Sequence, residues 1–203
     1  MKVITLDEFK FEEACKSLAR MSNIWKPDCL LGIRTGGYVV AKKMQPHYDK
    51  SVIPVFAVTK QRSSTKAKQA SALIPFILKT LPYWITNRLR VLEHNKLTRK
   101  EITGFAASAW VPDADEWEIL KTGLTRLTPS RILIVDDAID TGVTMSAVEK
   151  AIKALCPYAE VRTAVIVQST ANPLVRPNDV LFSQQLCRFP WSHDFKKAAR
   201  PLV

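Results

Sequence analysis

Glycine is scarce in this chain. Only six of its 203 residues are glycine, whereas average usage near 7% would give about fourteen. Three of the six fall in the stretch 32–37 (GIRTGG), and a fourth, Gly142, lies beside a run of acids. Because glycine adopts backbone conformations that other residues avoid, we expect both stretches to be loops with special backbone requirements, and we look for function there.

The chain has four cysteines and no long uncharged apolar run. The four cysteines form no CxxC or Cys/His metal spacing, which favours free buried thiols of a reducing compartment over disulfides. The first 20 residues carry acids throughout and no apolar h-region, and no uncharged apolar run reaches the roughly 18 residues of a membrane span. With 47% hydrophobic and 24% charged residues, disorder is excluded. We expect a cytoplasmic protein with no membrane partner.

Positive charge is concentrated in one segment. The chain carries a formal charge of +11. The segment from Lys50 to Lys100 contains eleven basic residues and a single acid, Glu93. The remainder is nearly neutral. This distribution predicts one basic module on an ordinary domain rather than a uniformly basic nucleic-acid-binding protein.

Predicted strands and helices alternate along the chain. Hydrophobic patterning predicts strands over 29–33, 51–59, 131–137, 161–168 and 180–183, and helices over 6–21, 38–44 and 142–155. This alternation predicts an α/β fold with a doubly wound, mostly parallel sheet covered on both faces, in a single domain over 1–203.

An all-helical pattern interrupts the alternation between residues 62 and 131. Apolar residues recur at helical spacing from Leu73 to Leu92 and are broken by Pro75 and Pro82, so we expect two or more helices. Two further helix starts and one helix stop are predicted at 98–101, 113–116 and Gly123. We interpret about 66–123 as an inserted, basic, helical subdomain.

The most informative stretch is 132–144, ILIVDDAIDTGVT. An apolar strand delivers Asp136 and Asp137 to its carboxyl end, where open α/β sheets bind ligands. The following turn into a helix, with its threonines and backbone N–H groups, suits a phosphate. Carboxylates accept from vicinal ribose hydroxyls while amides hold a 5′-phosphate, so a sugar phosphate matches. An ordinary βα turn with a capping Asp is the less favoured alternative.

Four hydrophobic residues, two acids and a T-G-x-T loop resemble the phosphoribosyl-pyrophosphate (PRPP) motif of type I phosphoribosyltransferases, in particular the purine (hypoxanthine/xanthine–guanine) branch. The resemblance covers about 28–62 and 127–192. It implies that Asp136 and Asp137 hold the ribose hydroxyls, and that Asp140 lies near N7 of a purine and handles its proton; these three are the catalytic candidates. The implied PRPP-binding residues are Asp136, Asp137, Ala138, Ile139, Asp140, Thr141, Gly142, Val143 and Thr144.

The loop 32–37 is similar to the pyrophosphate loop of the same family. Paired glycines let backbone amides approach a diphosphate, and Arg34 adds a charge-assisted donor. For Lys60 and Arg62, just beyond the second strand, a solvated surface charge is an equally good interpretation. The diphosphate-binding candidates are Arg34, Thr35, Gly36, Gly37, Lys60 and Arg62.

The predicted base pocket departs from the family pattern. Gln168 stands where purine enzymes carry a lysine, and its amide can read a base edge. Phe182 lies where a base-stacking aromatic is expected, although a core role is as good an interpretation. These two residues are the base-binding candidates. The segment 189–191 resembles an F-P-W of bacterial xanthine–guanine and hypoxanthine enzymes and is expected to pack, and His193 is expected at the surface.

The reaction that the resemblance implies is Mg²⁺-dependent transfer of ribose 5-phosphate from PRPP to a purine-like or atypical base, with release of diphosphate. Positioning and electrostatic stabilisation would carry the catalysis. Asp136 and Asp137 are the candidate metal ligands. Two alternatives stay open: the reverse reaction, which releases a base from a nucleotide, and a PRPP- or nucleotide-sensing regulator that binds nucleic acid through the insertion.

The role of the insertion is also open. An enlarged hood over the site or an oligomer contact is favoured, and we expect a homo-oligomer, a dimer, whose small-molecule partners are PRPP and a base. The alternative is a docking surface for a polyanion. Its contacts would then be Lys66, Lys68, Arg88, Arg90, Arg99 and Lys100.

Overall fold

The structure is a computed structural model of the chain. It describes residues 1–33, 35–49, 53–59, 78, 80–103 and 112–196, with the backbone alone described for 96–103. All statements below concern these residues.

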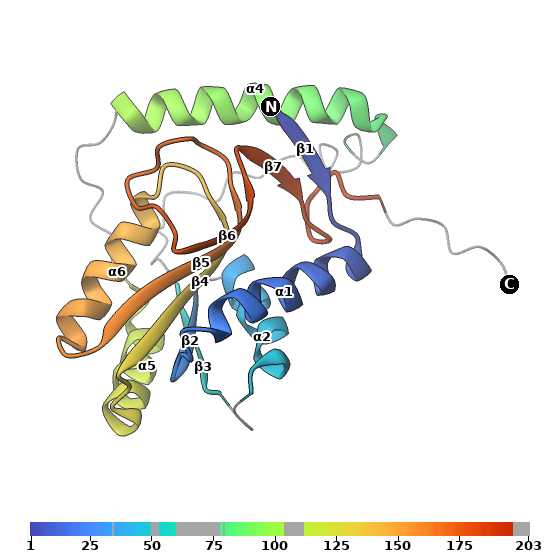
Figure 1. Ribbon diagram of the computed structural model, residues 1–203. Coiled ribbons are helices and arrows are strands. Elements are labelled where there is room, and N and C mark those ends of the chain that lie inside the picture. The colour runs from blue at the N-terminus through green and yellow to red at the C-terminus, as the bar shows by residue number, and fades with distance from the viewer. Residues whose placement is uncertain (34, 50–52, 60–77, 79, 104–111, 197–203) are drawn as a thin grey trace, which may run out of the picture.

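Five parallel strands form the central sheet, in the order β3-β2-β4-β5-β6 (Figure 1). The strands are β2 (Cys29–Ile33), β3 (Val55–Val58), β4 (Arg131–Ile139), β5 (Glu160–Gln168) and β6 (Asp179–Ser183). In the register of the centre, Leu31 lies beside Ile134, which lies beside Thr163. The predicted α/β class with a parallel sheet is confirmed. Because all strands run the same way, their carboxyl ends meet at one edge of the sheet.

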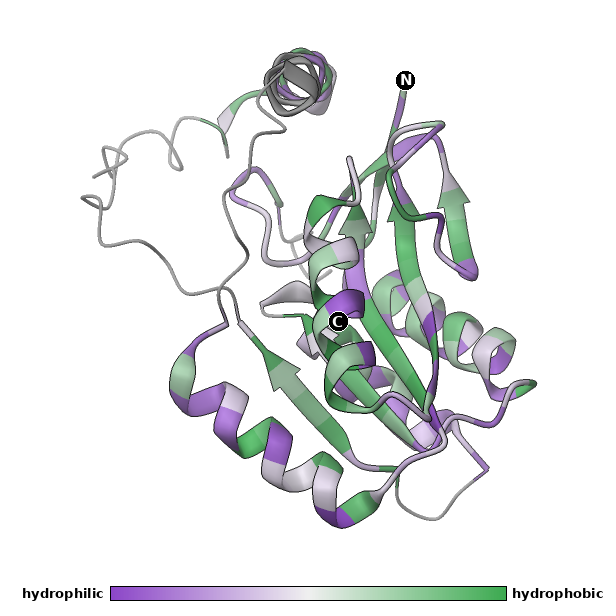
Figure 2. Ribbon diagram, turned by 90° about the vertical axis from the view of Figure 1, so that its left-hand side faces the viewer, coloured by the Kyte–Doolittle hydropathy of each residue, from purple (hydrophilic) through white to green (hydrophobic). Residues whose placement is uncertain are grey.

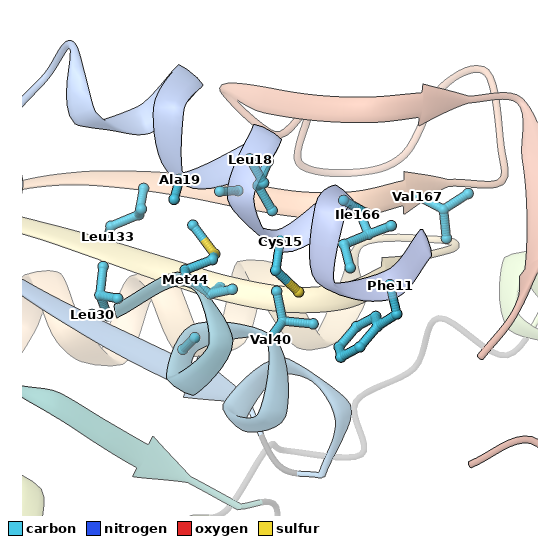
Figure 3. Close-up of a cluster of buried hydrophobic side chains, with 14 of the residues drawn as sticks. Phe11, Cys15, Leu18, Ala19, Leu30, Val40, Met44, Leu133, Ile166 and Val167 are labelled. Carbon is cyan, nitrogen blue, oxygen red and sulfur yellow. The ribbon is translucent and has the colours of Figure 1, made fainter. Parts of the chain in front are cut away.

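Helices cover both faces of this sheet. On one face lie α1 (Glu8–Asn23) and α2 (Gly36–Met44), and on the other lie α5 (Ala114–Leu127) and α6 (Val143–Leu155). Leu18 and Met44 belong to the first core cluster (Figure 3), and Leu120 and Ile152 to the second. Figure 2 shows the strands as the apolar layer between helices with polar outer faces. The sheet is doubly wound, as predicted.

A second, two-stranded sheet joins the beginning of the chain to its end. β1 (Lys2–Thr5) pairs in parallel with β7 (Gln185–Arg188), and the amide of Leu6 donates to the carbonyl of Arg188 at 2.9 Å. Sequence analysis missed both strands. Each has only four residues, and their pairing joins segments about 180 positions apart, which no local pattern reports.

The helix α4 (Tyr83–Thr103) crosses above the carboxyl edge of the sheet (Figure 1). The predicted break at Pro82 is confirmed, since Pro82 immediately precedes α4 and its carbonyl accepts from the amide of Ile85 at 3.1 Å. The predicted helix start at 98–101 is wrong, because those residues continue α4 without interruption. Pro75 lies outside the described residues.

The helix α5 begins where expected but continues past its predicted end. Asp113 caps it by accepting from the amide of Glu116 at 3.3 Å. Gly123 is not a helix stop: it lies inside α5, where a Cβ atom would fall 2.2 Å from the ring of Phe56. Gly123 therefore permits close packing on β3. Although α5 overlaps the predicted insertion, it belongs to the layer that covers the sheet.

Two further expectations concern the cysteines and the length of apolar helices. All four cysteines are free, and Cys15, Cys29 and Cys187 are buried, which confirms the prediction of free thiols. Among the described helices, none combines the length and the apolar character that a membrane crossing requires.

Candidate active site

The loops after β2 and β4 meet at the carboxyl edge of the sheet. Together they line a pocket of about 310 Å³. Ile33, Thr35 and Gly36 line it from the first loop, and the continuous run 136–145 lines it from the second. The structure thus brings together the two stretches that the glycine pattern singled out, which are about a hundred residues apart in the chain.

Glycines allow this close approach. A Cβ atom on Gly37 would fall 2.3 Å from the carbonyl oxygen of Val135, and one on Gly36 would fall 2.2 Å from the carboxylate carbon of Asp137. Gly32 has a different role, because its Cβ would meet the backbone of Tyr38 at 2.4 Å. Gly32 therefore lets α2 pack back on β2, whereas Gly36 and Gly37 let α2 begin directly against β4.

Asp136 and Asp137 form a buried acidic pair at the end of β4. Burial raises the pKa of Asp136 well above its usual value, and the neighbouring charge of Asp137 raises it further. Burial also raises the pKa of Asp137, although hydrogen bonds from Asp136 and from the backbone oppose this shift. The amide of Asp137 donates to Oδ1 of Asp136 at 2.9 Å. Two acids that are costly to ionise together are suited to receiving hydroxyl donors and a cation from a ligand.

The turn between β4 and α6 has the geometry of an anion cradle. Gly142 has a φ of +80°, the left-handed conformation that favours glycine, and caps the N-terminus of α6. Thr141, Val143 and Thr144 line the pocket beside it. The amide of Leu174 donates to the carbonyl of Thr141 at 2.7 Å, which holds the turn from outside. Free N–H groups at a helix start, together with its dipole, attract a phosphate.

Asp140 lies further along the same loop with a side chain that is 55% exposed. The hydroxyl of Ser169 donates to its Oδ1, and Nδ1 of His94 lies 3.6 Å from the same oxygen. Thr170 donates to the backbone carbonyl of Asp140 at 2.6 Å. Sequence analysis missed His94 and Ser169. His94 follows Arg90 by four positions on α4, and this polar spacing was the signal that could have identified it.

The base-binding candidates lie outside the residues that line this pocket. Gln168 donates its side-chain amide to the carbonyl of Thr170 at 2.7 Å, and Phe182 packs against the core beneath α1. Their roles toward a base stay predictions. Within 189–191 the two aromatic rings stack at a centroid distance of 4.9 Å, and Phe11 meets Trp191 edge-on. The contacts of this segment are those of packing, as expected.

Several predicted basic residues cannot be placed. Arg34, Lys60, Arg62, Lys66 and Lys68 lie outside the described residues, and for Arg99 and Lys100 only the backbone is described. Their roles stay predictions.

A buried ionic network fixes α4 to the rest of the fold. Arg188, fully buried, donates to Asp194 at 2.8 Å and to Thr86 of α4 at 2.9 Å. Arg90 donates Nε to Asp194 at 2.9 Å. Burial raises the pKa of Asp194, but the hydrogen bonds and charges of the two arginines outweigh this and hold it at about 2. Arg90, predicted as a polyanion contact, is instead engaged inside the protein. His193 is exposed, as predicted.

The donor set limits what the site can hold. In the part of the chain that the structure describes, no group of three or more His, Cys, Asp or Glu side chains could bind a metal ion. In the pocket, Asp136 and Asp137 offer two adjacent carboxylates. This set fits Mg²⁺, which proteins commonly bind through one or two carboxylates together with substrate phosphates.

Residues 7–195 match the family model of the phosphoribosyl transferase domain. The chain belongs to this family. The resemblance deduced from the two glycine loops is thereby confirmed, together with the predicted class of enzyme, a phosphoribosyltransferase, and the match extends over nearly the whole chain.

Solved structures share the fold of this phosphoribosyltransferase at low identity. A purine phosphoribosyltransferase from Pyrococcus horikoshii OT3 is 16% identical with a TM-score of 0.56, covering 98% of this chain and 99% of that one. The xanthine-guanine-hypoxanthine phosphoribosyltransferase of Helicobacter pylori is 15% identical with a TM-score of 0.56, covering 94% and 93%. A hypoxanthine-guanine phosphoribosyltransferase from Bacillus anthracis is 12% identical with a TM-score of 0.50, covering 88% of this chain and 81% of that one. Comparison with curated protein sequences gives no significant match.

Proposed function

We propose that this phosphoribosyltransferase transfers ribose 5-phosphate from PRPP to a nitrogenous base and releases diphosphate. The observation that carries the proposal is the single pocket in which the glycine loop at Gly36 faces the acidic pair and the start of α6. PRPP has a phosphate at one end, a ribose in the middle and a diphosphate at the other end. The start of α6 offers an anion cradle for the phosphate, Asp136 and Asp137 offer two carboxylates for the ribose, and the loop at Gly36 matches the diphosphate.

The acidic pair would bind the ribose and stabilise its charge. Asp136 and Asp137 accept from the vicinal hydroxyls, and their negative charge stabilises the positive charge that develops on the ribose as the bond to diphosphate breaks. Since burial raises the pKa of both acids, donors and a cation brought by the ligand offset an electrostatic cost that is already present. When bound with the substrate, Mg²⁺ at these carboxylates would neutralise the departing diphosphate.

Asp140 would act on the base. Its carboxylate is the most exposed of the three acids and lies at the rim of the pocket. There it accepts the proton that the base nitrogen loses when the new bond to ribose forms. The acceptor is of the purine class, a proposal supported by the solved structures of the same fold, which are named as purine phosphoribosyltransferases.

The first test is ligand-induced thermal stabilisation. PRPP with Mg²⁺ at a hundred times its Kd would add about 2.7 kcal/mol, which for a chain of this size raises Tm by roughly 5–10 °C. The double variant Asp136→Asn/Asp137→Asn is expected to lose this shift. Asp115→Asn, an exposed acid on α5, is the matched control and keeps it. A wild-type protein whose Tm does not respond to PRPP contradicts the proposal.

The acceptor is identified by measuring diphosphate release with PRPP and a panel of purines, other bases and nucleosides. Incubating nucleotides with diphosphate and detecting the free base tests the reverse direction in the same pocket. Release of diphosphate with a purine at a rate that Asp140→Asn lowers supports the assignment of Asp140. No release with any acceptor contradicts transferase activity.

A further inference from the structure

The helix α4 docks through its polar face. Thr86 and His94, 1% and 8% exposed, are buried against the body of the protein, whereas Trp84 and Leu92 are 64% and 65% exposed. A surface helix normally buries its apolar stripe instead. The rotation of α4 about its axis is therefore set by specific polar contacts, and these decide which side chain points at the active site.

The ionic network supplies these contacts one turn away from His94. Arg90 is fixed by Asp194 and also donates to the carbonyl of Cys187 at 3.2 Å. Residues four positions apart lie on the same helix face, so the face that carries Arg90 also carries His94. Buried Arg188 ties the same face to β7 through Thr86. With this face held, His94 extends from α4 to the rim of the pocket.

At the rim, two side chains from different elements converge on one oxygen of Asp140. Ser169, after β5, donates its hydroxyl to Oδ1, and Nδ1 of His94 lies 3.6 Å from Oδ1. Both contacts, from Ser169 and from His94, are made to Oδ1 of Asp140 and leave its Oδ2 out. A carboxylate held through one oxygen presents the other in a fixed direction. Contacts of catalytic groups are often long without ligand and shorten in the complex, which is the behaviour expected of the 3.6 Å separation.

We propose that His94 is a positioning residue for Asp140. Its imidazole donates Nδ1–H to Oδ1 and, with Ser169, holds the carboxylate so that Oδ2 accepts the proton from the acceptor base. The proton moves from the base nitrogen to Oδ2, and His94 itself exchanges none. This inference rests on the proposed function, and it makes α4 a supplier of part of the active site rather than only a cover.

The kinetic test compares two substitutions of the same residue. The side-chain amide nitrogen of asparagine lies about where Nδ1 of histidine lies, so His94→Asn keeps the donor, whereas His94→Ala removes it. We expect His94→Ala to lower kcat about 10- to 100-fold with KM for PRPP unchanged, and His94→Asn to recover most of the loss. His193→Ala, at an exposed histidine, is the control without effect. Equal losses in both His94 variants, a loss confined to KM, or full activity of His94→Ala overturns the inference.

A second readout does not depend on activity. The chain has three histidines, so the imidazole nitrogens of His94 can be resolved by NMR on ¹⁵N-histidine-labelled protein. We expect a proton on Nδ1 of His94, and a change of the His94 signals in Asp140→Asn that leaves His47 and His193 unaffected. Unchanged His94 signals in that variant overturn the inference. If the wild type releases no diphosphate with any base, the proposed function fails, and the NMR result still decides whether His94 holds Asp140.

Discussion

Gly36 begins α2 so close to Asp137 that a Cβ atom on it would fall 2.2 Å from the carboxylate carbon. The next residue, Gly37, stands equally close to the backbone of β4. Two loops about a hundred positions apart are in contact here because neither glycine has a side chain. The shape of the pocket therefore depends on glycine at both positions, and even a substitution by alanine is expected to change it.

Gly37→Ala is expected to damage both the fold and ligand binding. The added Cβ meets the carbonyl oxygen of Val135 at 2.3 Å and the Cα of Asp136 at 2.7 Å, and backbone atoms cannot rotate away as a flexible side chain can. Overpacking of this kind costs about 1–3 kcal/mol. Because the displaced strand carries Asp136, PRPP binding is expected to weaken at least about tenfold, equivalent to about 1.4 kcal/mol, as measured by calorimetric titration.

Gly123→Ala provides the matched control, since its Cβ would meet the ring of Phe56 at 2.2 Å in a region away from the pocket. It is expected to lower Tm while leaving the Kd for PRPP unchanged. Wild-type affinity in Gly37→Ala would show that the contact between α2 and β4 does not shape the site.

Asp136→Asn is expected to stabilise the protein without ligand. Burial and the adjacent Asp137 raise the pKa of Asp136 in the folded state. Such an acid contributes to the free energy of unfolding at a pH below its pKa in the unfolded chain. This contribution is lost as the pH rises through its pKa in the folded protein. At pH 7 the carboxyl is ionised in the unfolded chain, so its raised pKa in the folded state opposes folding, and a neutral amide relieves this cost. We expect Tm to rise by about 2–4 °C for each kcal/mol gained.

The same reasoning predicts that the gain disappears below about pH 4, where the wild-type carboxyl is protonated in both states. Thermal unfolding of the wild type and of Asp136→Asn from pH 3 to pH 8, without PRPP, measures the difference in Tm. A lower Tm of Asp136→Asn at pH 7 would contradict the electrostatic origin of the raised pKa.

Asp194 has the opposite pH dependence. The guanidinium groups of Arg90 and Arg188 outweigh the effect of burial and hold its pKa at about 2. An acid with a lowered folded pKa stabilises above its unfolded value and loses that contribution as pH falls through the folded one. The shift from the usual value corresponds to about 2 kcal/mol, which is expected to be lost between about pH 4 and pH 2.

Urea unfolding at a series of pH values tests this prediction. Asp194→Asn is expected to be less stable than the wild type at pH 7 and to have a flatter profile through the acid window, whereas Asp115→Asn, at an exposed site on α5, follows the wild type. Identical acid profiles for Asp194→Asn and the wild type would remove Asp194 as the titrating group.

The thiols are expected to differ in reactivity. Burial raises the pKa of Cys15 and of Cys187 to about 12, and Cys29 is fully buried, so little thiolate is available at these sites. Cys156 is only partly buried. With a disulfide reagent at pH 8 we expect one fast-reacting thiol in the folded protein, absent from Cys156→Ser, and four after unfolding. A fast phase that persists in Cys156→Ser would contradict this assignment.

Local patterns predicted the elements that position the pocket. The strand over 29–33 is found with the predicted bounds because a short apolar run, buried at all five positions, ends at the glycine loop. The strand leading to Asp136 differs only in extending to Ile139. Prediction failed where distant contacts override local preference. Residues 98–101 resemble a helix start, yet they continue α4, which contacts with Arg188 and Asp194 hold in place. Gly123 resembles a helix stop, yet it lies inside α5, where it packs on Phe56.

The sequence by itself determined the chemistry of one βα turn: two acids at a strand end, a left-handed glycine and a helix start are adjacent along the chain, so their geometry follows from local structure. Tertiary structure alone decided that the glycine loop meets this turn, that α4 buries its polar face, and that His94 reaches Asp140. These contacts join residues tens of positions apart, which no local pattern encodes. The glycine loop meets the turn because β2 and β4 are neighbours in the sheet, and the buried network of Arg188 and Asp194 orients α4.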